Sequence, residues 1–241
     1  MDIRISDKDK HRFKGFCFTP EIIMLVVYMK CRFSLSYREL EELAMMRGIV
    51  LDHATCQRWI IKFVSFIEEK VRRRKKPVGK SCRMDETYIK AQGKWVYLYR
   101  AVDKYGNTID FLLKEYRDGK AAKAFFKKSI NRNGEPESVV IDKSGSNLAA
   151  LKSINKNKKE SDKIKINRSK YLNNIVEQDH RFIKKRIKPM LGFKSIKSAK
   201  ITLAGIECVH MIKKCQVWGS KRGKLVFENS FLMQCFERSI K

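Results

Sequence analysis

Acidic residues are scarce in this sequence, whose 241 residues include 26 aspartates and glutamates against 54 lysines and arginines. The resulting formal net charge of +28 is spread along nearly the whole chain rather than confined to a tail. A surplus of this size indicates a polyanionic partner, because basic side chains gain free energy by displacing the counterions of phosphates.

Long apolar runs are also missing. The longest, residues 22–29, is closed by Glu21 and Lys30 and falls far short of the ~20 residues that a bilayer span needs, so it predicts a core helix and no membrane partner.

The first residues alternate in charge and contain no apolar segment of a secretory signal, so we expect the protein in the cytoplasm. Disorder is excluded too, because 43% hydrophobic and 10% aromatic residues can offset the conformational entropy of folding.

No Cys-x-x-Cys pair occurs among the cysteines, which stand at positions 17, 31, 56, 82, 208, 215 and 235. A zinc module around Cys208 with His210, or around Cys208 with Cys215, would need a second pair of ligands, and the sequence offers none at ligand spacing. We therefore expect reduced and mostly buried thiols.

The first 76 residues predict three helices. Thr19, before a proline, is a predicted N-cap for the first, Ser36 and Glu39 have the spacing of a capping box, and Asp52 caps the third. Two of these helices are joined by a short turn that contains glycine, which is the layout of a helix-turn-helix motif. Residues 53–58 would then be the exposed first turns that could enter a major groove. The alternative is an ordinary helical hairpin, but the positive net charge favours a helix-turn-helix that binds DNA.

A basic run at residues 70–76 ends this region, just before Pro77. It is either a solvated linker or a hinge that places Arg72, Arg73 and Arg74 on DNA phosphates, and the two interpretations are compatible. We predict a helical domain over residues 1–76 that includes this linker.

Beyond residue 80 the apolar period changes to that of strands. Three β-prone runs separated by turn residues predict an antiparallel meander, and a helix followed by an apolar strand implies a crossover, so the sheet should be mixed. The predicted strands cover residues 84–89, 95–102, 108–113 and 138–142, with a helix at 120–130. Trp95 and Tyr97 alternate with Val96 and Leu98, so we expect them to pack in the sheet rather than to stack on bases.

The remainder of the chain is mainly helical by its pattern. A polar turn at residues 143–147 leads into a short helix at 148–154, and a short strand is expected near 163–166. A long helix from about residue 173 ends near Pro189 and Gly192, and one more helix covers 198–214. The sequence leaves the structure of the tail, residues 217–241, open.

Three carboxylates stand out in a chain so poor in acids. Asp85 interrupts a strand pattern, where a buried carboxylate is costly unless it is paired or bound to metal. Asp142 ends an apolar strand, at the place where open sheets put their ligands. Glu177 shares a predicted helix face with three basic residues, His180, Arg181 and Lys184. For any one acid alone a surface ion pair is the commoner explanation, but together they predict a Mg²⁺ site suited to phosphodiester chemistry.

Three blocks of the sequence resemble the DDE transposases of insertion sequence family six. They are residues 83–90 (RMDETYIK) with 93–103 (GKWVYLYRAVD), 141–145 (IDKSG), and 173–184 (NNIVEQDHRFIK) with 191–195 (LGFKS). The spacing also fits, because 34 residues separate Asp142 from Glu177 and Lys184 follows seven residues after Glu177. Residues 36–40 and 52–55 match the family's helical region, so that the resemblance covers about residues 13–216. The chain departs from the pattern at Cys56-Gln57 and at Cys82.

The resemblance implies an α/β fold with two domains. The all-α helix-turn-helix domain comes first. The catalytic domain, residues 77–216, follows it and has an RNase H-like, integrase-type mixed sheet. It implies that Asp85, Asp142 and Glu177 are catalytic and hold Mg²⁺ or Mn²⁺, as two ions. Lys184, with Arg181 beside it, would contact DNA near the transposon end. The residues expected to recognise terminal inverted repeats are His53, Thr55 and Arg58.

The implied activity is metal-dependent DNA transposition, in which a transposon end is cleaved and its freed 3′-hydroxyl attacks target DNA. The implied partners are double-stranded DNA and further copies of the chain, in a homodimer or higher homo-oligomer that holds two ends together. A non-catalytic or decayed DNA-binding regulator, and an RNase H-like nuclease without strand transfer, are the alternatives. Metal dependence would exclude the regulator, and a joined product would exclude the nuclease.

Overall fold

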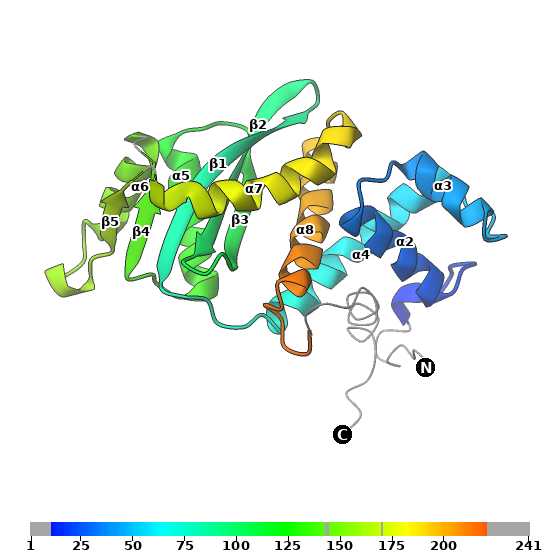
Figure 1. Ribbon diagram of the computed structural model, residues 1–241, viewed down its shortest axis with the longest axis horizontal. Helices are drawn as coiled ribbons and strands as arrows, with labels where there is room; N and C mark the ends of the chain where they lie inside the picture. The colour runs from blue at the N-terminus through cyan, green and yellow to red at the C-terminus, as the bar shows by residue number, and fades with distance from the viewer. Residues whose placement is uncertain (1–10, 143–144, 170, 221–241) are drawn as a thin grey trace. The chain divides into compact units, whose positions relative to one another are not determined.

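A computed structural model describes residues 11–142, 145–169 and 171–220 of the protein. This part of the chain forms two compact units (Figure 1). The helical unit comprises the described parts of Met1–Lys76 and Lys185–Lys241, and the sheet unit is Pro77–Lys184. Within these described stretches, no helix combines the length and hydropathy that crossing a bilayer requires.

The helical unit confirms the helices predicted from the sequence. Its elements in the described residues are η1 (His11–Phe13), α2 (Pro20–Arg32), α3 (Tyr37–Met45), α4 (His53–Arg73), η4 (Lys188–Met190) and α8 (Ile196–Lys213). The turn between α3 and α4 contains Gly48, whose φ of 70° lies in the left-handed region that glycine adopts without strain. Helix, turn and helix thus follow one another as expected, while a role in DNA binding remains a prediction.

Local signals begin these helices where the sequence predicts. Ser36 accepts a hydrogen bond from the Glu39 backbone N–H, and the Glu39 carboxylate accepts from the Ser36 N–H, which completes the capping box. The Asp52 carboxylate accepts from the Thr55 N–H at 2.8 Å. Thr19 has the extended backbone of an N-cap, but its side chain makes no capping bond. The start of α2 therefore depends on the proline at its first position.

Helix α8 forms the centre of the core of the helical unit. It is buried on nearly all sides and packs against α4 and α2, as expected for a helix that is apolar all round. A Cβ at Gly205 would overlap the Cys31 sulfur of α2 and lie 3.1 Å from Val64 of α4. Glycine therefore permits the close approach of the three helices. The predicted catalytic domain, residues 77–216, includes this helix, and its boundaries stay a prediction.

The sheet unit is built on a five-stranded mixed sheet of order β3-β2-β1-β4-β5. The strands are β1 (Ser81–Ala91), β2 (Lys94–Asp103), β3 (Thr108–Lys114), β4 (Ser138–Ile141) and β5 (Lys165–Arg168). The first three are antiparallel, and β4 runs parallel to both β1 and β5. This topology confirms the predicted meander, the crossover and the α/β, RNase H-like class.

Helices cover both faces of this sheet. They are α5 (Gly119–Asn133), α6 (Gly145–Asn155) and α7 (Asn174–Ile187), and the short segments η2 (Glu160–Asp162) and η3 (Tyr171–Asn173) precede β5 and α7. In Figure 1, α7 crosses the near side of the sheet and α5 lies behind it. On the α5 side, Met84, Tyr99 and Phe125 belong to one buried cluster. Of the polar turn expected at residues 143–147, the first two positions lie outside the described residues, and the expectation is wrong for the other three, because they form the first turn of α6.

The described cysteines are free, and most of them are buried, as predicted. Cys31, Cys56, Cys82 and Cys208 are buried, Cys17 is exposed and Cys215 is half-buried. Burial raises the pKa of the Cys31 and Cys82 thiols to about 12, so these groups stay protonated and behave as small apolar side chains. Cys235 lies outside the described residues.

The packing at Gly205 predicts that Gly205→Ala destabilises the protein although alanine is the better helix former. Overpacking a buried helix contact costs about 1–3 kcal/mol, against a propensity gain of about 1 kcal/mol. We expect a net loss of up to about 2 kcal/mol in the free energy of unfolding, measured by urea denaturation.

Gly119→Ala is the matched control, because a Cβ at this first residue of α5 meets no described atom within 4 Å. It should leave stability unchanged or raise it slightly. A Gly205→Ala variant as stable as Gly119→Ala would show that the three helices are not held at the close distance described here.

Candidate metal centre and nucleic-acid contacts

The parallel pairing of β1 with β4 brings Asp85 and Asp142 together. Arg83 lies opposite Val140 in this register, and parallel strands advance together by about 3.3 Å per residue. Asp85 lies two residues beyond Arg83, and Asp142 lies two residues beyond Val140. The two aspartates therefore stand at the same level of the sheet. Asp142 directly follows the last residue of β4, at the carboxyl end of the strand.

Glu86 joins these two aspartates in what we call the carboxylate cluster. Ligand oxygens of Asp85, Glu86 and Asp142 all lie within 4.8 Å of one another. The Glu86 side chain is only 3% exposed, and its Oε1 has no hydrogen-bond partner in the described part of the chain. A buried acceptor without a donor is costly, and a bound cation would satisfy it. The donor set, all oxygen, suits a divalent metal ion.

Glu86 was missed by the sequence analysis, although it stands beside Asp85 in the motif. Consecutive strand residues face opposite sides, so a neighbouring acid gives no reason to expect a shared site. What the sequence did offer was a second costly carboxylate in the same strand. That signal could have marked Glu86 as a further candidate.

The carboxylate cluster crowds negative charge into a half-buried place. Burial first, and then the nearby charges of Glu86, Asp142 and Glu177, together raise the pKa of Asp85 to about 6. Burial also raises the pKa of Glu86, whereas the charge of Arg117 lowers it. A divalent cation bound here would reduce both the cost of burying these carboxylates and the repulsion among them.

Arg117 supplies positive charge at the edge of the carboxylate cluster. Its Nη2 lies 3.4 Å from Glu86 Oε2 and 3.4 Å from Asp142 Oδ2. Asn147, which is buried in α6, donates from Nδ2 to Asp142 Oδ1 at 3.4 Å. Arg117, from the segment between β3 and α5, thus bridges Glu86 and Asp142, and Asn147 of α6 contacts Asp142 as well.

Helix α7 is attached to the other face of the sheet by a buried ion pair. Arg100 of β2, with no exposed side-chain surface, donates from Nη2 to Asp179 Oδ2 at 2.7 Å. The next residue, His180, has its Nδ1 3.7 Å from Asp85 Oδ2. Burial, together with the charges of Arg100 and Lys184, lowers the pKa of His180 to about 3. His180 is therefore neutral near pH 7 and forms no ion pair with Asp85.

Glu177 stands in the first turn of α7, one turn before His180. It is exposed and is not part of the carboxylate cluster, yet its charge contributes to the raised pKa of Asp85. Arg181 and Lys184 are exposed on the same helix, whereas His180 is buried. The predicted face of four polar residues is thus divided, because the ring of His180 turns toward the sheet.

The predicted DNA contacts of the helical unit lie at the start and end of α4. The His53 Nδ1 is 2.9 Å from Glu41 Oε2, and Arg58 is 72% exposed with Nη2 bonded to the Thr55 hydroxyl. At the other end, α4 continues to Arg73, so most of the basic run is helix rather than the expected linker. The ion pairs of this end join Arg72 to Glu68 and Arg73 to Glu69, and Arg74 is the C-cap.

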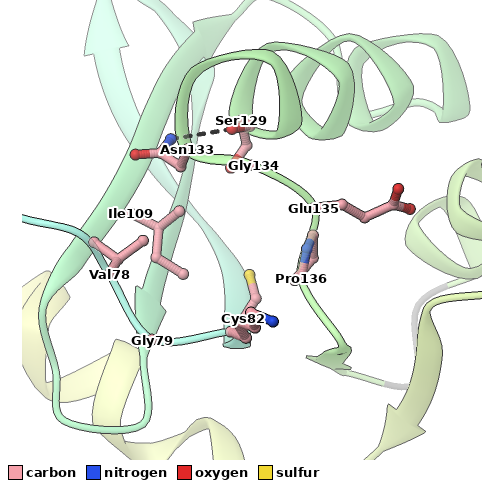
Figure 2. A pocket seen from close by; sticks show the side chains of 10 residues that line it. Val78, Gly79, Cys82, Ile109, Ser129, Asn133, Gly134, Glu135 and Pro136 are labelled. Carbon is pink, nitrogen blue, oxygen red and sulfur yellow. Dashed lines mark hydrogen bonds between the residues drawn. The ribbon is translucent and has the colours of Figure 1, made fainter.

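A separate hollow lies near the start of β1 (Figure 2). Val78, Cys82, Ile109 and Pro136 are among its lining residues, and Asn133 Nδ2 donates to the Ser129 carbonyl at 3.0 Å beside it. None of the predicted site residues lines this hollow. The hollow therefore lies apart from the carboxylate cluster, which is further along β1.

Comparisons with known proteins identify relatives of this chain. A family model described as a DDE domain matches residues 79–216. The transposase for insertion sequence-like element IS431mec of Staphylococcus aureus is 39% identical over 200 residues, which cover 82% of this chain and 86% of that protein. The transposase for insertion sequence element IS257 in transposon Tn4003 of Staphylococcus aureus has the same identity and coverage. Among solved structures, the HTLV-2 integrase catalytic core domain in complex with magnesium (trimeric form) aligns with a TM-score of 0.44 and 15% identity, over 64% of this chain and 97% of that one.

The raised pKa of Asp85 predicts a pH-dependent stability of the metal-free protein. This carboxyl titrates near its ordinary value of 3.8 in the unfolded chain and near 6 in the folded protein, so the folded state binds the proton more tightly. Ionised Asp85 therefore disfavours folding above pH 6, and the penalty disappears as the pH falls from 6 toward 4.

Asp85→Asn mimics the protonated carboxyl and tests this sign. In EDTA at about pH 7.5 we expect its melting temperature to exceed that of the wild type by about 2–4 °C, and the difference should shrink as the pH falls below 6 and vanish only below about pH 4. Added Mg²⁺ or Mn²⁺ should raise the melting temperature of the wild type and not that of the variant. Asp162→Asn, at an exposed carboxyl outside the cluster, is the control and should respond to metal as the wild type does. A metal response that survives in Asp85→Asn would remove Asp85 from the metal centre.

Proposed function

Because the chain belongs to the DDE transposases of insertion sequence family six, we propose that Asp85, Asp142 and Glu177 are its catalytic carboxylates. The protein is a polynucleotidyl transferase that acts in DNA transposition. The observation that carries the assignment is the meeting of Asp85 and Asp142 at the carboxyl end of β4, with Glu177 close enough to raise the pKa of Asp85. Glu86 is a further candidate ligand on the grounds of burial and position.

The proposed cofactor is Mg²⁺ or Mn²⁺, bound as two ions. Asp85, Asp142 and Glu177 would hold the ions, which when bound lower the pKa of the attacking hydroxyl group and stabilise charge on the leaving oxygen. The Oε1 of Glu86, which has no hydrogen-bond partner among the described residues, and the repulsion among the carboxylates both favour binding of cations at this site. The identity and number of the ions are part of the proposal.

The side chains around the cluster have distinct tasks in this proposal. The carboxylates would hold the cations, and the bound cations would position the reacting phosphate. Neutral His180 packs against Asp85 without adding a competing positive charge. Arg181 and Lys184, exposed on α7, neutralise the phosphates on either side of the reacting bond. Water attacks first and the freed 3′-hydroxyl attacks second, so no covalent protein intermediate is needed.

Binding of DNA is proposed to depend on both units. The net charge of +28 supports strong, salt-dependent attraction to phosphates. His53, Thr55 and Arg58 at the start of α4 would read the terminal repeats, and Arg72, Arg73 and Arg74 at its end would contact the backbone. Both the transposon ends and the target would be double-stranded DNA.

Synapsis of two transposon ends favours a homodimer or a higher homo-oligomer. This part of the proposal follows from the reaction class, because each end needs its own set of catalytic carboxylates. The cytoplasm is the proposed location, since the chromosomal DNA of a bacterium is found there.

The assignment predicts that Asp85→Ala, Asp142→Ala and Glu177→Ala each retain DNA binding and lose strand transfer by at least about 100-fold. Activity is measured as the joined product of an oligonucleotide carrying the element's own terminal repeat, with Mg²⁺ or Mn²⁺ and with EDTA. Binding is measured on the same oligonucleotide by gel shift. The physical reason is that removing a metal ligand leaves the phosphate contacts intact and removes the charge stabilisation of the transition state.

Glu137→Ala is the control, because Glu137 is an exposed carboxylate paired only at the surface with Lys80. It should join DNA as the wild type does. If any of the three variants still joins DNA, the substituted residue is not a catalytic carboxylate. Cleavage without joining in the wild type would favour the nuclease, and binding with neither activity would favour the regulator.

A further inference from the structure

Two large aromatic side chains lie exposed on the hairpin formed by β1 and β2. Tyr88 is 58% exposed and Trp95 is 59% exposed. Their ring centroids are 5.2 Å apart at an interplanar angle of 80°, an edge-to-face contact. We call these two residues the aromatic pair. The sequence-based expectation that Trp95 packs in the sheet is wrong, whereas Tyr97 does pack against the buried cluster.

The strand register explains why the aromatic pair is left uncovered. Tyr88 lies opposite Tyr97 and Lys90 lies opposite Trp95, so these side chains share the face that carries Met84 and the α5 cluster. On the other face, Ile89 and Val96 are only 2% and 3% exposed. The hairpin thus extends beyond the buried cluster on one face only.

The same register places the aromatic pair next to the carboxylate cluster. Glu86 and Tyr88 are two residues apart on one strand and therefore point to the same face, about 7 Å apart along the strand. The pairing of β4 with β1 ends at Arg83, and Asn173, directly before α7, donates from Nδ2 to the Met84 carbonyl at 3.3 Å. A group bound on the aromatic pair would lie within one nucleotide of a phosphate at the cluster.

A positive charge accompanies the aromatic pair. Lys184 Nζ of α7 lies 5.5 Å from the centre of the Tyr88 ring, within the range of a cation–π interaction. Lys90 and Lys94 of the hairpin are exposed as well. Exposed aromatic rings beside lysines match the chemistry of single-stranded nucleic acid, in which flat bases alternate with phosphates.

We propose that the aromatic pair and Lys184 bind an unpaired nucleobase of the DNA strand next to the reacting phosphate. The base stacks on the aromatic pair, and the ammonium group of Lys184 contacts the phosphate beside it. A base inside a duplex is stacked on its neighbours, so the surface selects DNA whose end is open, frayed or unpaired. This inference rests on the proposed function, because it needs a DNA end at the carboxylate cluster.

The test compares two DNA probes in EDTA, so that no strand is cut. One is a blunt duplex, and the other is the same duplex with a short single-stranded overhang that contains 2-aminopurine. We expect Tyr88→Ala and Trp95→Ala to lower the affinity for the overhang probe by about 10-fold or more, and to leave the blunt duplex within about 2-fold. Stacking also quenches 2-aminopurine fluorescence, and this quenching should be lost in both variants.

Tyr105→Ala is the matched control. Tyr105 is 73% exposed and has Lys104 Nζ 4.9 Å from its ring centre, so it repeats the lysine–tyrosine arrangement at the turn between β2 and β3. It should bind and quench as the wild type does. Tyr88→Phe and Trp95→Phe keep a ring and should retain the quenching, which separates loss of stacking from misfolding.

Equal losses on blunt and overhang probes, or quenching that survives in both alanine variants, would overturn the inference. A wild type that binds the overhang no better than the blunt duplex would overturn it too, while leaving the transposase assignment intact. Failure of the proposed function looks different, because the wild type would then yield no joined product in the strand-transfer assay, whichever probe it binds.

Discussion

The parallel register between β1 and β4 is the constraint on which the carboxylate cluster depends. It sets Arg83 opposite Val140 and thereby brings Asp85 level with Asp142, although the two lie far apart in the chain. A slip of one residue would turn every side chain of β1 to the opposite face. The carboxylates repel one another once they meet, and Arg117 at one side offsets part of this repulsion. The same register also carries the aromatic pair to its place beside Glu86.

A buried ion pair determines where the third carboxylate of the proposed site stands. Arg100 and Asp179 meet beneath α7, and breaking such a pair leaves an uncompensated buried charge, which costs about 3–5 kcal/mol. This penalty fixes the helix against the sheet. Glu177 precedes Asp179 by two residues, so the ion pair positions Glu177 without any direct contact. His180 follows and presents a neutral ring to Asp85.

Other acids in the strands show that burial alone does not mark a site. Asp103 is fully buried, but its oxygens accept hydrogen bonds from the backbone of Gly79, Tyr105 and Asn107. Asp110 is buried as well and is paired with Lys128 and Arg132. Such acids stabilise turns and packing, because their lone pairs are satisfied within the protein. The carboxylate cluster differs in that acids face acids there.

The sequence by itself determined the elements and the family. Caps such as Ser36 and Asp52 begin helices through contacts within a few residues, and the strands follow from alternation along the chain, so the predicted elements agree with the structure to within a few residues. The motif blocks likewise named Asp85, Asp142 and Glu177. Only the tertiary structure decided that Glu86 joins the cluster, that His180 is turned inward, that Trp95 is exposed and that α8 packs with α2 and α4. These outcomes depend on which surfaces meet across long separations in the chain, and no local pattern of residues encodes that.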